Sequence, residues 1–270
     1  MKATYGPDRY LLLVVLLTAL AWAPLFYPGL FQSHSGLLAV YDVAALHQTL
    51  QQTQFSPGWT PALSDGGPFP FYLAEAPVLL GVGPVEAVKL VLGASILGAG
   101  LTMYVLVRRL WGRRPALLAA MIYTYAPFFL ATIYVRGDLA DALAYALAPL
   151  VFWPACDALA GQRGVLIGLA LALAALVWTQ PGLALAMAAL VAAYVLWRTI
   201  ARRAGRTLLA AITALAAGGL LGLLLVVDLG RANRPSGARP PGGPPQPARA
   251  WSPPAGTGPA SCRPARPSAG

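Results

Sequence analysis

Charged side chains are scarce in this sequence, and their scarcity excludes a soluble globular domain. They account for 10% of the 270 residues, against roughly 25% in an ordinary soluble domain. Hydrophobic residues account for 58%. The chain therefore has too little polar surface to fold in water around a single core.

Cysteines and recognisable cofactor motifs are also few. Cys156 lies in an apolar run and Cys262 in the C-terminal segment, and their spacing fits neither a disulfide nor a metal site. Cysteine usage therefore does not indicate the redox compartment. The sequence has no phosphate-binding loop, dinucleotide-binding fingerprint or Ser-His-Asp order, which argues against soluble-cofactor chemistry.

Long apolar runs are abundant instead. A bilayer accepts about 20 apolar residues as a spanning helix, because a helix satisfies its own backbone hydrogen bonds. The first run is longer than a signal-peptide core, which favours an uncleaved helix over a cleaved signal. The pattern predicts an all-α, polytopic transmembrane helix bundle of about seven helices within residues 1–228. The runs are 10–27, 85–107, 115–135, 139–159, 164–178, 182–197 and 207–227.

The formal net charge of +10 follows membrane topology rather than a nucleic-acid surface, so we expect no nucleic-acid partner. With the N-terminus in the cytoplasm, the arginine clusters at 108–114, 163 and 198–206 all fall inside, as the positive-inside rule requires. The long loop 29–76, which has no lysine or arginine, falls outside; only Arg136 breaks the pattern. We therefore expect a multi-pass protein of the bacterial inner (plasma) membrane, with the lipid bilayer as its partner.

Residues 229–270 differ in composition from the rest of the chain. They hold eleven prolines, seven glycines and six arginines, and no acid. Such a segment cannot bury a core and is predicted to be disordered. A genuine tail and a Pro-rich binding segment are two interpretations. We favour a third, a reading-frame shift near residue 228, because a GC-rich gene read out of frame encodes mostly these residue types.

The predicted outer loop contains the first candidate site. Residues 37–53 have the pattern of an interfacial helix, with Asp42 in the middle of its apolar face. A buried acid is costly, so Asp42 is either held by a partner or functional as a base or metal ligand. Trp59 and Tyr72 are either bilayer anchors or platforms for a sugar or lipid chain. The two histidines, His34 and His47, have the pattern of solvated loop residues rather than ligands.

Charges at membrane depth form the second candidate site. Arg136 either makes an ion pair with Asp138 or Asp141 that closes the turn, or binds a phosphate, for which a guanidinium is suited. Lys89 is predicted near the outer end of a helix. There it either extends to the membrane surface or meets an anionic lipid headgroup.

Several segments together resemble bacterial multi-pass membrane proteins of the GT-C glycosyltransferase superfamily, in the group labelled 6-pyruvoyl-tetrahydropterin synthase-related membrane protein. The resemblance covers about residues 10–227. We expect no pterin chemistry, because its histidine-ligated zinc needs more than the two histidines present. The segments that carry the resemblance are Pro28-Gly29-Leu30, His34-Ser35-Gly36, Trp59-Thr60-Pro61, Gly66-Gly67-Pro68-Phe69-Pro70-Phe71-Tyr72, Met103-Tyr104 with Arg108-Arg109, Tyr123 with Ala126-Pro127, and Tyr134-Val135-Arg136-Gly137 with Asp141 and Pro149-Leu150.

The resemblance implies a cell-envelope enzyme that transfers sugar from a polyprenyl-phosphate donor outside the cytoplasm. An acid in the first outer loop then serves as base or metal ligand. The resemblance is therefore compatible with a divalent metal cofactor. Relatives often read His-Asp-Gly where this chain has Ser35, so Asp42 or Asp65 takes the catalytic role. The superfamily usually has more helices, which favours a fragment. A lipid or solute transporter and a non-catalytic, degenerate membrane protein are the alternatives. The candidate substrate-binding residues are Arg136, Asp138, Asp141, His34, Trp59, Tyr72 and Lys89.

Overall fold

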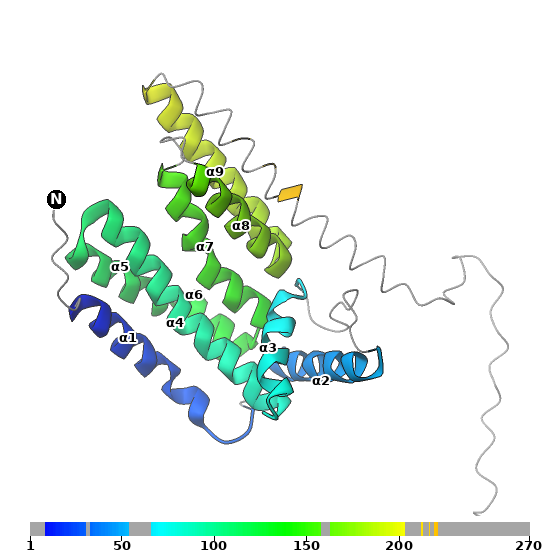
Figure 1. Cartoon of the computed structure of the whole chain (residues 1–270). Helices are drawn as coiled ribbons and strands as arrows, with labels where there is room; N and C mark the ends of the chain where they lie inside the picture. The colour runs from blue at the N-terminus through cyan, green and yellow to red at the C-terminus, as the bar shows by residue number, and fades with distance from the viewer. Residues whose placement is uncertain are drawn as a thin grey trace, which may run out of the picture. The chain divides into compact units, whose positions relative to one another are not determined.

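The computed structural model describes residues 9–30, 33–53, 66–157 and 163–202, together with residues 212, 216, 219 and 220. The chain divides into two compact units, Met1–Arg234 and Pro235–Gly270, and every described residue lies in the first. All regular elements of this described part are helices (Figure 1). The predicted tail and most of the apolar run at 207–227 lie outside the described residues.

Four described helices are long and apolar enough to cross a bilayer. They are α1 (Arg9–Trp22) continued by η1 (Ala23–Phe26), α4 (Pro84–Trp111), α7 (Leu139–Asp157) and α9 (Pro181–Arg202).

The predicted run at 115–135 is broken rather than straight. It consists of α5 (Arg113–Thr124), α6 (Pro127–Ala131) and the π-helical turn η2 (Thr132–Arg136), with a bend of 40° after α5. Pro127, which has no N–H to donate, begins the new helix. If α5 and the segment Pro127–Arg136 are counted together as one bent span, the described part has five candidate spans. The apolar helix α8 (Arg163–Thr179) has 17 residues, so the predicted number of about seven is not confirmed.

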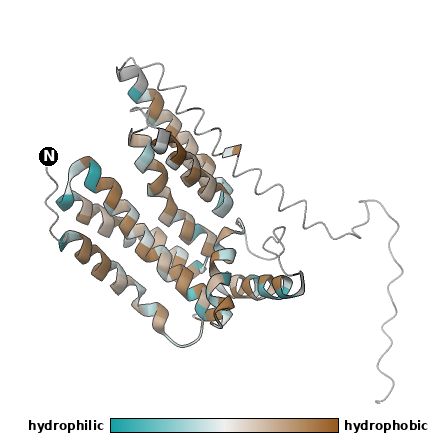
Figure 2. Ribbon diagram, viewed as in Figure 1, coloured by the Kyte–Doolittle hydropathy of each residue, from teal (hydrophilic) through white to brown (hydrophobic). Residues whose placement is uncertain are grey.

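α4 and α7 form the centre of the bundle. About half of each spanning stretch is buried, 50% in α4 and 56% in α7, against 22% for the span that begins with α1 and 17% for α9. Large apolar side chains are exposed on these two outer helices, including Leu12 and Leu185. Figure 2 shows that hydrophobic residues predominate along the spanning helices. In water such surfaces would be unstable, whereas in a bilayer they contact lipid. The protein is therefore an integral membrane protein.

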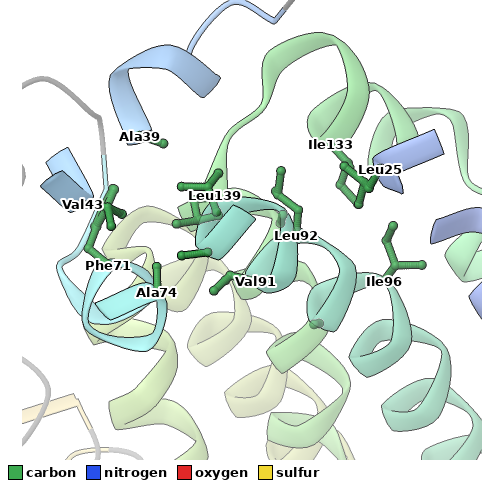
Figure 3. Packing of buried hydrophobic residues seen from close by; sticks show 14 of the residues in the cluster. Leu25, Ala39, Val43, Phe71, Ala74, Val91, Leu92, Ile96, Ile133 and Leu139 are labelled. Carbon is green, nitrogen blue, oxygen red and sulfur yellow. The ribbon is translucent and has the colours of Figure 1, made fainter. Parts of the chain in front are cut away.

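Two further helices, α2 (Gly36–Thr53) and α3 (Phe69–Leu79), lie beside the spans. Val43 of α2 packs near Phe71 and Ala74 of α3 in the largest buried cluster (Figure 3). α2 buries Asp42 with its apolar neighbours and exposes Tyr41, as the spacing predicted. α3 begins within the predicted outer loop, at Phe69, and continues through Pro77.

Glycine lets α1 approach α4 closely. A Cβ on Gly100 would overlap the buried Thr18 of α1, whose hydroxyl is held by two backbone carbonyls of its own helix. A Cβ on Gly98 would lie 3.4 Å from Ala146 of α7, an ordinary contact. Small residues at helix contacts provide much of the packing in membranes.

We predict that Gly100→Ala destabilises the protein by about 1–3 kcal/mol, the usual cost of overpacking. Gly98→Ala is the matched control, and it should be neutral or slightly stabilising because alanine favours the helix. Thermal unfolding in detergent micelles, followed by tryptophan fluorescence, measures both. Equal melting temperatures for the two variants would contradict the α1–α4 contact.

Candidate functional site

Four chain turns meet at one end of the bundle, and we call this region the turn junction. It consists of residues 33–36, 66–68, 135–138 and 179–181. Backbone hydrogen bonds join the turns in pairs: His34 N–H donates to Val135 O at 3.0 Å and Ser35 N–H to Arg136 O at 2.7 Å. Gly67 N–H donates to Thr179 O at 2.8 Å. Segments far apart in sequence are thereby fixed side by side.

Two glycines permit this approach. A Cβ on Gly67 would overlap the Trp178 carbonyl, a backbone group that cannot move aside cheaply. Gly137 has φ +67°, and a Cβ there would press against the side chain of Ser33. A glycine tolerates both the left-handed conformation and the close contact. These glycines belong to the short motifs that carry the family resemblance, so the motifs mark where the turns touch.

Arg136 lies at the centre of a charged network in the junction. Its guanidinium contacts Asp141 at 2.8 Å and Asp138 at 3.2 Å, so both predicted ion pairs form. Gln180 donates to the other Asp141 oxygen at 2.7 Å, which ties the start of α7 to the α8–α9 turn. Arg136 is still 47% exposed and ends the π-helical turn η2. Such turns occur frequently at functional sites, and the hydrophobic pattern gave no signal for this one.

Asp138 caps α7. Its Oδ1 accepts the backbone N–H groups of Ala140 (3.1 Å) and Asp141 (3.0 Å), as N-cap residues do. Burial raises the pKa of the Asp138 carboxyl above its ordinary value. The hydrogen bond from the Asp141 backbone N–H and the positive charge of Arg136 lower this pKa. The negative charge of the Asp141 side chain raises it further. Asp138 thus has a structural role at the site, whatever else it contacts.

Ser35 is held in the junction. Its hydroxyl donates to the Arg136 carbonyl at 2.8 Å, in addition to the backbone bond of the same pair. An ionised aspartate has no proton to donate, so it could not make this bond. The neighbouring His34 is exposed, as predicted. The position where the resemblance leads one to expect an acid therefore serves to connect two turns.

The structure places the proposed catalytic acids differently. Asp42 is fully buried on the inner face of α2, beside Ala39 and Val43. Asp65 and Trp59 lie outside the described residues. The partly buried ring of Tyr72 lies 6.1 Å from the ring of Trp178, next to the turn at 179–181.

Lys89 does not extend to the membrane surface, and that expectation was wrong. The side chain is 5% exposed, and its Nζ donates to the Tyr27 carbonyl at 2.8 Å and to Glu86 at 3.1 Å. Burial of an ammonium requires such partners. The carbonyl comes from a residue 62 positions away, so a hydropathy pattern could not have indicated it.

His47 is not a solvated loop residue, and a second polar site surrounds it. His47 Nδ1 lies 2.7 Å from Oε1 of Glu75, whose side chain is 3% exposed. His47 Nε2 lies 2.8 Å from Gln51 Nε2, one helical turn further along α2. The sequence singled out neither Glu75 nor the pair, because they lie 28 residues apart on different helices.

A cavity of about 340 Å³ opens beside this pair, between α2 and α3. We call it the α2–α3 groove. Its polar lining consists of His47, Gln51 and Glu75, and its other walls are Leu50, Tyr72, Ala76 and Leu79. Among the described residues, no group of three metal-ligating side chains is found here or elsewhere.

A larger groove, of about 460 Å³, is almost wholly apolar. It lies between α7 and α8 near Arg109, with Trp153, Pro154 and Gly168 in its walls. Apart from Arg109 it has no side chain suited to proton transfer or to binding a polar substrate. The chemistry of the described part is therefore concentrated at the turn junction and the α2–α3 groove.

A helical bundle with lipid-facing spans and a polar junction of turns at one end defines a polytopic membrane protein. Residues 65–229, more than half of the chain, match the family model of dolichyl-phosphate-mannose-protein mannosyltransferases. The chain belongs to this glycosyltransferase family. No curated protein and no solved structure matches it.

We predict that Asp138→Ala destabilises the protein by about 0.5–2 kcal/mol, the usual cost of losing a helix cap. Asp138→Asn should lose less, because its side-chain oxygen still accepts the two N–H groups and burial no longer opposes a charge. Thermal unfolding of both variants at neutral pH measures this. An asparagine variant that is no more stable than the alanine variant would show that the ion pair with Arg136, rather than the cap, holds the turn.

Proposed function

We propose that this protein is a GT-C-like membrane glycosyltransferase, or the N-terminal portion of one, that takes sugar from a polyprenyl-phosphate donor on the extracytoplasmic side. The observation that carries the proposal is the match of residues 65–229 to a glycosyltransferase family. Three of the four junction turns, those at 66–68, 135–138 and 179–181, lie within the matched region. The part of the fold that the family shares therefore includes most of the proposed site.

Charge distribution supports the membrane orientation of this proposal. The chain passes along α4 from the junction end to Arg108, Arg109 and Arg113, and returns through α5 and α6 to Arg136. α9 likewise begins at the junction with Pro181 and reaches Arg198 at its far end. Clusters of arginine favour the cytoplasm. In this orientation the N-terminus of α1 is cytoplasmic and the turn junction is extracytoplasmic. We assign the protein to the bacterial inner membrane.

Within this site we assign Arg136 to the phosphate of the donor. Its side chain is about half exposed, and the residue is the last one of the π-helical turn η2 at the junction. Guanidinium groups bind phosphate oxygens through paired hydrogen bonds. Asp138 and Asp141 hold the guanidinium in place, and His34 and Trp59 complete the predicted binding surface. Lys89 is left out, because its side chain is only 5% exposed, whereas that of Arg136 is 47% exposed.

The base that activates the acceptor is assigned to Asp42 or Asp65. In the sequence, Asp42 belongs to α2, and Asp65 precedes α3 by four residues. Asp42 is fully buried on α2, and a carboxylate is one of the side-chain groups that serve as a general base. A divalent cation at either carboxylate is compatible with the family chemistry. Ser35, as a hydrogen-bond donor, does not take this role.

We predict transfer of radiolabelled sugar from a polyprenyl-phosphate donor to a lipid or protein acceptor by the complete gene product in proteoliposomes. Either Asp42→Ala or Asp65→Ala should lower kcat by roughly 10²-fold or more, the usual contribution of a positioned base. Gln48→Ala, at an exposed position of α2, is the control. If both variants keep full activity, the assignment of the base fails. If the wild type transfers nothing, a non-catalytic protein or a transporter takes the place of the enzyme.

We predict that Arg136→Lys raises the KM for the donor about tenfold and changes the melting temperature much less. Lysine keeps the positive charge for Asp141 but cannot bind a phosphate through two parallel hydrogen bonds. KM and melting temperature are measured on the same preparation. A variant that melts lower with an unaltered KM would assign Arg136 to the turn alone.

A further inference from the structure

The groove between α7 and α8 takes no part in the proposed transfer reaction. We call it the α7–α8 groove; its volume is about 460 Å³, and its walls are apolar apart from Arg109. On α8 its lining extends from Gly164 to Ala175, about 16 Å of helix at 1.5 Å per residue. This length is about half of the roughly 30 Å hydrocarbon core of a bilayer. The groove therefore has the depth of one lipid leaflet.

The groove is open to the bilayer. Leu171, on its α8 wall, is 57% exposed, and Trp153, on its α7 wall, is 39% exposed. Gly168 leaves room between them: outside its own helix, the nearest described atom to a Cβ built there is the Pro154 Cβ, at 4.0 Å. Apolar side chains and lipid tails are equally apolar, so an acyl chain can lie against such walls without a cost in polarity.

Two arginines lie at one end of the groove. A second cavity, of about 350 Å³, has Arg108, Arg109 and Trp153 in its lining, and the last two also line the groove. Both arginines are exposed, in the last turn of α4. Trp111, which ends α4 and is 71% exposed, is of the type that anchors helices at the level of the lipid headgroups. The guanidinium groups are thus placed at headgroup level, beside a groove at the depth of the acyl chains.

The charge at this end favours one kind of occupant. Arg108 and Arg109 are the charged residues in the described linings of the two cavities. A guanidinium has five N–H donors and binds phosphate through paired hydrogen bonds, so a contact within the protein still leaves donors for a phosphate. Basic pockets between membrane helices on the cytoplasmic side bind anionic lipid headgroups. The apolar run 207–227 contains no acid, so a protein segment of this kind would leave the arginines without a counter-charge.

We propose that the α7–α8 groove binds one anionic glycerophospholipid, with an acyl chain along α8 and the phosphate on Arg108 and Arg109. In the proposed orientation this lipid belongs to the cytoplasmic leaflet, whereas the donor phosphate is assigned to Arg136 at the other end of α7. The site does not require transfer activity, so it goes beyond the proposed function. The lipid joins α4, which supplies the arginines, to α7 and α8, which supply the walls. Its binding should therefore stabilise the folded bundle.

The test is native mass spectrometry of the full-length protein in detergent micelles. The probes are dioleoyl phosphatidylglycerol and dioleoyl phosphatidylcholine, which have the same chains and one phosphate each, but of which only the first has a net negative charge. We expect one phosphatidylglycerol molecule to bind at least tenfold more tightly than phosphatidylcholine and to raise the melting temperature. Equal affinities for the two lipids overturn the proposal.

A matched pair of double variants locates the headgroup. Arg108→Gln with Arg109→Gln should weaken phosphatidylglycerol binding about tenfold or more and abolish the preference over phosphatidylcholine. Arg113→Gln with Arg114→Gln removes the same charge from exposed arginines outside both cavity linings, and it should change the affinity less than twofold. An equal loss in the two double variants would show a diffuse attraction between surface charge and the lipid, and the site would be refuted.

A second pair locates the acyl chain. Gly168→Leu should weaken the binding of both lipids about tenfold or more, because the leucine side chain takes the place of the acyl chain. Gly182→Leu, at an exposed glycine of α9 with open space around it, is the control and should have no effect. Unchanged lipid binding by Gly168→Leu contradicts the proposal; if this variant also melts at a lower temperature, a protein segment fills the groove instead.

Competition separates the phospholipid from the lipid-linked donor, which also combines a phosphate with a long apolar chain. We expect an equimolar polyprenyl phosphate to leave phosphatidylglycerol bound. Displacement that depends on Arg108 and Arg109 would assign the groove to the donor and overturn the proposal. Phosphatidylglycerol binding by a protein that transfers no sugar contradicts the proposed enzyme alone and supports the lipid site.

Discussion

The pairing of backbone groups between distant turns is the constraint on which the rest of the site depends. Where turns pack against one another, their N–H and C=O groups are removed from water and must find partners within the protein. Here the turns pair with one another, through His34, Ser35 and Gly67. Such pairing brings backbone N and O atoms within about 3 Å of each other and leaves no room for a Cβ at Gly67 or Gly137. Glycine at the contacts, the cap on α7 and the position of Arg136 all follow from it.

Much of this architecture could be predicted from the sequence, because hydrophobic length and arginine position respond directly to the bilayer. The start of α4, the turn at Arg136 and the burial of Asp42 agree with the patterns that predicted them. The break before Pro127 and the helix at Phe69–Leu79 were missed. Both occur in stretches whose apolar residues lie on all faces, with Glu75 as the charged exception in α3. There periodicity says little, and only tertiary packing decides where a helix bends or begins.

The polar partners could be predicted least well. Lys89 and the Tyr27 carbonyl are 62 residues apart, and His47 and Glu75 are 28 apart on separate helices. Neither pair is encoded in a local pattern, since each forms only when the helices dock. Arg136 and its acids were easier to identify, because all three lie within six residues at an unusual position for charge. Sequence reasoning thus found the polar groups that are close in the chain and missed those that are close only in space.

The helix α2 connects the turn junction to the α2–α3 groove. Its first residues are tied to the Arg136 turn by Ser35, its inner face buries Asp42, and its next turn presents His47 to Glu75 of α3. Asp42 and His47 are five residues apart, so they lie on different sides of the helix, about 140° apart. A movement of α2 would therefore change the junction and the groove together. Ser35 joins α2 to the Arg136 turn through its backbone N–H, which an aspartate could also donate, and through its hydroxyl, which an ionised aspartate could not replace as a donor.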